Sequence, residues 1–236
     1  MNELLRLHQE IVGCRACPRL VAHMQAVAVR KKREFATWDY WARPLPGFGD
    51  PRARLLLIGL APAAHGGTRT GRMFTGDSSG AFLMRALHKA GFASQPSSVT
   101  REDGLVLRDA YIVLGARCAP PENKPLPEEM TRCRSFLVRE MALLERVRVV
   151  VALGKIAFDA FLAAAPELGI EVPRPRPAFG HGARCELGRV TLLSSYHPSR
   201  QNTNTGKLTP VMFDRIFAQA RKLLSGPPRE AKGGSR

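Results

Sequence analysis

The sequence predicts an α/β fold with three layers (α/β/α) around a central, mostly parallel sheet of four strands. Four short apolar runs alternate along the chain with segments of helical periodicity. The runs are apolar at successive positions, which is typical of strands buried on both faces of a parallel sheet. The length of 236 residues fits one hydrophobic core, since single cores grow to about 250–300 residues.

The apolar runs and the periodic segments give each element a place in the chain. The predicted strands cover residues 55–58, 110–114, 147–153 and 190–193. The predicted helices cover residues 4–12, 19–33, 79–90, 128–146, 156–164 and 209–224. No internal repeat and no sign of a second domain interrupts this order, so residues 1–224 are expected to form one domain. The Pro- and Gly-rich residues 225–236 are expected to form a disordered tail.

Three polar loops follow predicted strands, at residues 59–78, 115–127 and 194–208. Ligands of open parallel sheets bind outside the carboxyl ends of the strands, where such loops meet. The segment at residues 59–80, GLAPAAHGGTRTGRMFTGDSSG, carries six glycines, one Phe and one carboxylate. The sequence therefore predicts a functional site at this edge of the sheet.

The charge of the chain is strongly positive. Lys and Arg number 36 against 20 Asp and Glu, a formal net charge of +16. A basic balance of this size favours a polyanionic partner such as nucleic acid; a merely soluble basic surface is the alternative. The N-terminus lacks the pattern of a secretory signal, and no apolar run approaches the roughly 20 residues of a membrane span. A cytoplasmic protein without a membrane partner is expected.

Five cysteines in such a chain are expected to be thiols or metal ligands. Cys14 and Cys17 are close enough in sequence to clamp one metal centre. Cys118 follows the second predicted strand, and Cys133 lies on the helix that returns beside it. Four thiolates can bind zinc or hold an iron–sulfur cluster, and the spacing does not choose between them. Cys118 and Cys133 could instead be small core residues, and Cys185 is taken as structural.

The loops also contain the candidate catalytic groups. Asp77 is the only carboxylate of its loop, and it can be either a catalytic acid or an N-terminal helix acid. Phe74 can belong to the core or serve as a stacking platform. His197, in the segment YHPSRQN, lies on a polar loop after a strand with Arg200 and Asn202. That setting favours contact with an anion or a base edge.

Together these residues resemble the uracil-DNA glycosylase superfamily, and most closely its family 5, the bacterial and archaeal enzymes with an iron–sulfur cluster. The resemblance runs from Cys14 to about Pro210 and rests on residues 59–80, on RCAPPENKP, on VALGKIAF and on YHPSRQN. It implies a uracil-DNA glycosylase-like fold and a [4Fe-4S] cluster on Cys14, Cys17, Cys118 and Cys133. It also implies hydrolysis of the N-glycosidic bond of uracil in DNA, the first step of base excision repair.

The resemblance also implies a role for each site residue. Phe74 would stack on the base that the enzyme flips out of the helix. His197 would hydrogen-bond the pyrimidine O2 and stabilise charge on the leaving base. Asn123 is the candidate for reading the base edge, with a simple loop turn as the alternative. Other base-binding and DNA-binding positions are expected at Ala63, His65, Ser199, Arg200, Gln201 and Asn202.

One departure from the superfamily pattern lies just after the first strand. Most members carry an Asp, Asn or Glu there to handle the attacking water, whereas this chain has Leu60, Ala61 and Pro62. Family 5 shares the gap, and Asp77 is its proposed substitute for orienting water and stabilising positive charge on the sugar. Members of this kind accept more lesions, so hydroxymethyluracil, ethenocytosine or hypoxanthine are expected substrates beside uracil.

Two rival functions are also possible. GDSSG matches the G-x-S-x-G pattern of serine hydrolases, with Ser78, Asp159 and His197 as the triad, but about twenty residues separate Ser78 from the preceding strand. A DNA damage-binding module of the same fold, without turnover, is the second rival. Neither Lys155 nor Lys207 has a visible partner that would activate it for lyase chemistry. A monomeric, monofunctional enzyme that leaves an abasic site is expected, acting on DNA near the nucleoid.

Overall fold

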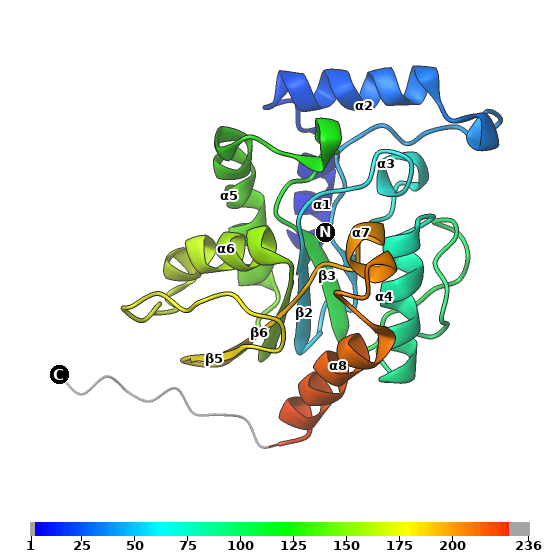
Figure 1. The fold of residues 1–236 in the computed structure, drawn as a ribbon. Helices are drawn as coiled ribbons and strands as arrows, with labels where there is room; N and C mark the ends of the chain where they lie inside the picture. Colours follow the sequence, from blue (N-terminus) through cyan, green and yellow to red (C-terminus); the bar gives the residue numbers. More distant parts are fainter. Residues whose placement is uncertain (1–2, 227–236) are drawn as a thin grey trace.

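A computed structural model describes residues 3–226 of the chain, and its centre is a six-stranded mixed sheet in the order β1-β3-β2-β4-β6-β5 (Figure 1). The predicted fold class is confirmed, while the predicted number of strands was two too low. Ser225 ends the last helix and so does not belong to the predicted tail. Residues 227–236 of that tail lie outside the described residues.

The four central strands are those that the sequence predicts, and they run parallel. They are fully buried, as their continuous apolar character requires. Their bounds are β2 (Leu55–Gly59), β3 (Ala110–Leu114), β4 (Val149–Leu153) and β6 (Val190–Ser195). Successive residues of β2 face opposite layers: Leu55 and Leu57 pack in one core cluster, and Leu56 and Ile58 in the other.

Two short antiparallel strands, absent from the sequence prediction, complete the edges of the sheet. The strand β1 (Phe48–Gly49) pairs with β3, and β5 (Arg184–Leu187) pairs with β6. The first has only two residues and lies in a Pro- and Gly-rich segment. The second alternates exposed charged residues with less exposed ones. Neither gives the continuous apolar run that marks a central strand.

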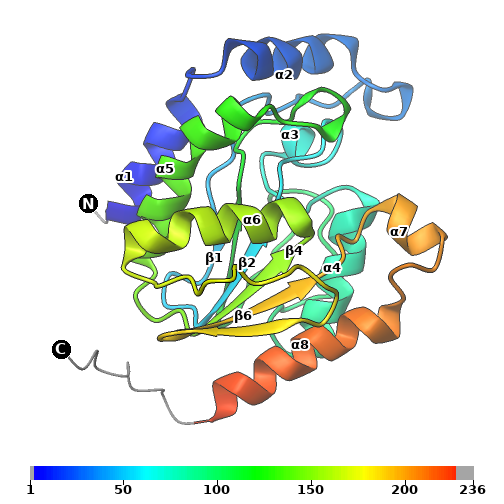
Figure 2. The same cartoon turned by 60° about the vertical axis from the view of Figure 1, so that its left-hand side comes forward.

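Helices cover both faces of the sheet (Figure 2). One layer contains α1 (Glu3–Gly13), α5 (Pro127–Leu143) and α6 (Lys155–Ala164), and the other contains α4 (Ser78–Lys89) and α8 (Pro210–Ser225). The helix α2 (Pro18–Arg30) lies outside these layers, above the carboxyl edge of the sheet (Figure 1). Its Leu20 and Met24 form a small separate cluster with Cys118 and Ala119.

The sequence prediction missed the short helical turns. These are α3 (Gly67–Thr70), α7 (Arg200–Asn204) and three 3-10 turns at Arg33–Phe35, Pro121–Asn123 and Ala165–Leu168. Segments of three to five residues are too short to display helical periodicity. In the structure α2 ends at Arg30 rather than at the predicted residue 33. The next residue, Lys31, adopts a positive φ of 41°. Within residues 3–226, no helix is long and apolar enough to cross a membrane.

Candidate active site

The loops that follow β2 and β6 bring Phe74 and His197 together at the carboxyl edge of the sheet. Their ring centroids are 6.3 Å apart, with 33° between the ring planes. A Cβ atom on Gly59, the last residue of β2, would lie 3.0 Å from the Phe74 ring. The absence of a side chain at the end of β2 therefore gives the ring its place against the sheet.

Phe74 is both a core residue and a wall of the site. Its side chain is 8% exposed and packs in the cluster of the α4 and α8 layer. The backbone adopts a positive φ of 51°, which is unfavourable for an aromatic residue. Gly80 permits this conformation, because a Cβ atom there would collide with the Phe74 carbonyl group. Strain held in place by a tight contact is typical of functional positions.

Asp77 caps the N-terminus of α4 and also faces the loop after β2. Its Oδ1 accepts a hydrogen bond from the Gly80 N–H at 2.8 Å. Its Oδ2 lies so close to Gly66 that a Cβ atom on that residue would collide with it. Burial raises the pKa of Asp77 above its usual value, against the hydrogen bonds and nearby arginines that lower it. Asp77 can therefore cap α4 through Oδ1 and still present Oδ2 to the loop after β2.

His197 is a largely buried imidazole with an unusually low basicity. Burial lowers its pKa to about 4, so the ring is neutral at physiological pH. Its carbonyl oxygen accepts hydrogen bonds from the Ser199 N–H and from Asn202 Nδ2, both at 2.8 Å. No protein group in residues 3–226 forms a hydrogen bond with the ring nitrogens. A neutral imidazole has one ring N–H, which can donate a hydrogen bond to a ligand.

The remaining residues of the HPSRQN segment divide between internal and outward contacts. Ser199 caps α7 by accepting from the Asn202 N–H at 3.3 Å, and the Asn202 side chain holds the His197 carbonyl. Arg200 and Gln201 are exposed. The Arg200 Nε donates to Ser78 Oγ at 3.1 Å and so links this loop to the start of α4. Two of the four predicted DNA-binding side chains therefore shape the loop, and two face solvent.

The predicted base-binding residues after β2 are half-buried and structured. The Ala63 carbonyl accepts hydrogen bonds from the N–H groups of Gly66 and Thr68. His65 Nδ1 is 3.0 Å from the hydroxyl of Tyr40. Burial lowers the pKa of His65, and nearby cationic side chains lower it further. Both residues belong to the loop that lies against Asp77.

Arg69 is a residue of this loop that the sequence interpretation missed. It is only 3% exposed, and its guanidinium carbon lies over the rings of both Phe35 and Trp38, at 3.8 and 4.1 Å from their centroids, in the corner that these two rings form. Its Nε donates to the His65 carbonyl at 2.8 Å and its Nη2 to the Gly76 carbonyl at 2.9 Å. Arg69 thus ties the two ends of the loop together. In the sequence, the signal for this role of Arg69 is an arginine in a glycine-rich loop with aromatic residues upstream.

Asn123 is not brought into contact with these groups. It is exposed, in the turn of Pro121–Asn123, with a positive φ of 59° and a backbone hydrogen bond from its N–H to the Pro120 carbonyl. Within the described part of the chain, no hydrogen bond involves its side chain. These contacts are those of the turn residue that the sequence analysis gave as the alternative.

The serine hydrolase triad is not assembled. Ser78 Oγ accepts from Arg200 rather than from a histidine. The Asp159 carboxylate forms an exposed ion pair with Lys155 at 2.6 Å on α6. Lys155 is therefore occupied, and Lys207 lies over the Tyr196 ring at 5.0 Å.

Four of the five cysteines line one cavity between α2, α5 and the loop after β3. They are Cys14, Cys17, Cys118 and Cys133, and Cys185 lies apart on β5. Burial raises the pKa of the Cys118 and Cys133 thiols, and the neighbouring sulfurs raise that of Cys118 further. In residues 3–226, no three His, Cys, Asp or Glu side chains are grouped as the ligands of a metal ion.

A buried polar network, also missed from the sequence, joins the cysteine cavity to the sheet. The Arg117 N–H donates to Cys133 Sγ at 3.3 Å, and its guanidinium forms a fully buried ion pair with Glu140. Glu140 also accepts from the Gly47 N–H at 2.8 Å, and His8 lies 3.3 Å from the same carboxylate. Because a buried carboxylate is costly without partners, this network fixes the side chains behind the cavity.

An aromatic ring, a neutral histidine and a half-buried carboxylate lie on loops at the carboxyl edge of the parallel strands, the edge at which α/β proteins of this class bind their ligands. The model of the uracil DNA glycosylase superfamily matches residues 46–221. The chain belongs to this superfamily.

Named relatives narrow the comparison. The chain is 52% identical over 216 residues to the type-5 uracil-DNA glycosylase of Thermus thermophilus, covering 91% of this chain and 95% of that protein. It is 50% identical over 224 residues to the type-5 uracil-DNA glycosylase of Mycobacterium tuberculosis, covering 94% and 82%. It is 46% identical over 210 residues to that of Pyrobaculum aerophilum, covering 89% and 88%.

Proposed function

We propose that this protein excises uracil from DNA by hydrolysing the N-glycosidic bond, and so starts base excision repair. The observation that carries the proposal is the convergence of Phe74, His197 and Asp77 at one edge of a superfamily fold. About half of the residues are identical to those of named type-5 uracil-DNA glycosylases over most of the chain. The basic surface, with a net charge of +16, supports DNA as the partner.

Phe74 and His197 would act on the flipped base. The aromatic ring offers a face on which a planar pyrimidine stacks. The neutral imidazole would donate a hydrogen bond to the pyrimidine O2 as negative charge develops on the leaving base. A donor that is already oriented, in a site shielded from water, stabilises such charge without reorganisation. The low pKa of His197 supports a neutral donor over an imidazolium.

Asp77 would act on the sugar and the attacking water. One oxygen is used by the Gly80 N–H, and the other faces the loop after β2, where the usual polar residue of the superfamily is absent. The ionised carboxylate would orient water and offset positive charge on the sugar. With no activated lysine at the site, the reaction would stop at an abasic site. The absence of that polar residue from 60–62 also supports the wider lesion set of hydroxymethyluracil, ethenocytosine and hypoxanthine.

We further propose that Cys14, Cys17, Cys118 and Cys133 hold a [4Fe-4S] cluster. The four thiols share one cavity, and the N–H of Arg117 directed at Cys133 Sγ is the kind of contact that stabilises a cluster sulfur. A multi-iron cluster spans more space than one ion, which agrees with thiols that share a cavity without grouping around a single metal. When bound, the cluster would cross-link the α1–α2 segment to α5 and the loop after β3.

The decisive experiment incubates purified wild type, Asp77→Ala and Asp159→Ala with a labelled duplex that contains one uracil. Abasic sites are read by cleavage with alkali, and a sample without alkali tests for lyase activity. Release by wild type and by Asp159→Ala, with loss in Asp77→Ala, is expected. Tight binding without release in all three proteins would support the damage-binding module instead. We also expect a cytoplasmic monomer, which sedimentation of the purified protein can test.

A further inference from the structure

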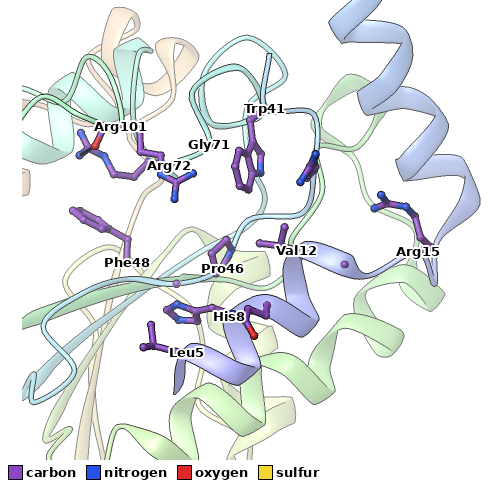
Figure 3. A pocket seen from close by; sticks show the side chains of 14 residues that line it. Leu5, His8, Val12, Arg15, Trp41, Pro46, Phe48, Gly71, Arg72 and Arg101 are labelled. Carbon is purple, nitrogen blue, oxygen red and sulfur yellow. Dashed lines mark hydrogen bonds between the residues drawn. The ribbon is translucent and has the colours of Figure 1, made fainter. Parts of the chain in front are cut away.

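A second cavity, of about 750 Å³, is lined in part by Gly71 and Arg72 of the loop that also carries Phe74 and Asp77 (Figure 3). Its volume is within the range of about 300–1,000 Å³ that small-molecule sites occupy. Trp41 and Phe48 are its aromatic walls, and Arg15 and Arg101 stand at its rim (Figure 3). Arg43 also lines it. Among the described residues that line this cavity, none carries a carboxylate.

The three arginines at the rim are available to a ligand. Arg15, Arg43 and Arg101 are exposed, and within residues 3–226 none of them forms an ion pair with a carboxylate. They come from three separate segments of the chain. Guanidinium groups that line one cavity without a carboxylate partner favour an anion, and their planar donors match phosphate.

The walls of the cavity are held in place before any ligand arrives. Trp41 packs on Gly71, where a Cβ atom would lie 3.0 Å from the indole, and the backbone N–H of Trp41 donates to the Arg69 carbonyl. Arg72 is buried and donates to Asp103 at 2.8 Å and to the Arg101 carbonyl at 3.1 Å. The segment that carries Arg101 is therefore fixed by a group that faces the same cavity.

The indole provides the planar part of the site. The guanidinium carbons of Arg101 and Arg43 lie 4.8 and 5.6 Å from the Trp41 ring centroid. Both guanidinium groups therefore lie over the indole. Aromatic rings and guanidinium planes are the surfaces on which unpaired bases stack, while neighbouring charges bind the phosphate. The cavity thus combines the two parts that a nucleotide needs.

We propose that this cavity binds a nucleotide unit, with its phosphate on Arg43 and Arg101 and its base beside Trp41. The unit can come from an unpaired DNA strand or from a free nucleotide. A strand is within reach of the candidate active site, because the two-residue step from Arg72 to Phe74 spans at most about 7 Å of backbone. The site is separate from the pocket for the flipped base and does not depend on excision.

Tryptophan fluorescence tests the proposal directly, because Trp38 and Trp41 are the only two tryptophans of the chain. In a Trp38→Phe protein, Trp41 is the sole reporter. The probes are thymidine monophosphate, a tetrathymidylate and inorganic phosphate, none of which contains uracil. A saturable change in emission with either nucleotide probe is expected. Tetrathymidylate binding at least tenfold more tightly than the monophosphate identifies the strand as the source, and equal affinities identify the free nucleotide.

Matched variants assign the binding to the cavity. Arg43→Ala/Arg101→Ala removes two exposed side chains and should weaken binding by about tenfold or more, since charge-assisted hydrogen bonds are the stronger ones. Arg189→Ala, in the turn between β5 and β6 at the opposite edge of the sheet, should leave it unchanged. The proposal would be overturned if the emission stayed constant with both nucleotides, or if inorganic phosphate changed it as much as the nucleotides do. It would also be overturned if Arg189→Ala weakened binding as much as Arg43→Ala/Arg101→Ala. If the protein did not excise uracil, these binding measurements would still test the cavity, because none of the probes contains uracil.

Discussion

The carboxylate of Asp77 lies directly against Gly66, closer than any side chain at that position would allow. The two residues are eleven positions apart, at opposite ends of the loop that Arg69 ties together. The loop thus brings a carboxylate against the segment that follows β2. A substitution at Gly66 therefore tests the position of the Asp77 carboxylate while leaving Asp77 itself unchanged.

Gly66→Ala should lower kcat/KM for uracil excision by about 100-fold, because a displacement of about 1 Å at a catalytic group can cost that much. The new methyl group would push Asp77 out of place. Gly180→Ala is the control, since a Cβ atom there meets only Ala183 Cβ at 3.8 Å. Steady-state rates on a single-uracil duplex measure both. Equal rates in the two variants would separate Gly66 from the reaction.

Asp77→Asn should reduce the rate of excision by about 100-fold or more and yet raise the Tm at neutral pH. Burial raises the folded-state pKa of Asp77, so its ionisation costs stability as the pH rises through that value. The amide still caps α4 but carries no charge. The Tm advantage should shrink as the pH falls toward about 4, the ordinary value for Asp. Calorimetry from pH 4 to 8 measures it, and a lower Tm at pH 7 would contradict the raised pKa.

His197→Ala should slow base release by about 100-fold to 1,000-fold with little effect on DNA binding, as expected for the loss of one oriented donor. It should also change acid stability. The folded-state pKa of His197 is about 4, below the ordinary value of about 6.5. Wild type therefore loses stability as the pH falls through this window, and the variant lacks that contribution. His88→Ala, an exposed histidine at the end of α4, is the control.

Phe74→Leu should slow excision from a duplex more than excision from a single strand. Leucine keeps an apolar group in the core but removes the ring face that holds a base out of the helix. Extrusion from a paired duplex costs a few kcal/mol, whereas an unpaired base costs less. The ratio of the two rates is the measurement. A ratio equal to that of wild type would assign Phe74 to the core alone.

Cys118→Ser should lower the iron and acid-labile sulfide content of the purified protein and its Tm together. Cys118 is buried in the cavity that all four predicted ligands line. Cys185→Ser, on β5, is the matched control and should leave iron, sulfide and Tm unchanged. Full iron content in Cys118→Ser, or its loss in Cys185→Ser, would remove the proposed ligand set.

The sequence predicted those parts of the fold that depend on continuous or periodic burial. The runs at 55–58 and 110–114 became central strands because every position in them is covered. The edge strands were missed because two residues, or an alternation of Arg184 and Glu186 with less exposed neighbours, give no such run.

The candidate site divides in the same way. Phe74, Asp77 and His197 could be found because each is an unusual residue in a polar loop after a strand or at a helix start. Arg69 and Glu140 could not, since their importance comes from partners far along the chain or from burial. Whether an arginine is solvated or packed against two rings is decided by tertiary packing.

The two short antiparallel strands have a consequence for self-association. A parallel sheet that ended at β3 and β6 would present long, flat, apolar edges with unpaired backbone groups, a template for pairing with other chains. Instead β1 covers one side with two residues, and β5 presents the paired charges of Arg184 and Glu186, 2.5 Å apart, on the other. Such edges do not favour pairing with the sheet of a second molecule. A high local concentration of the protein is therefore not expected to cause aggregation through these edges.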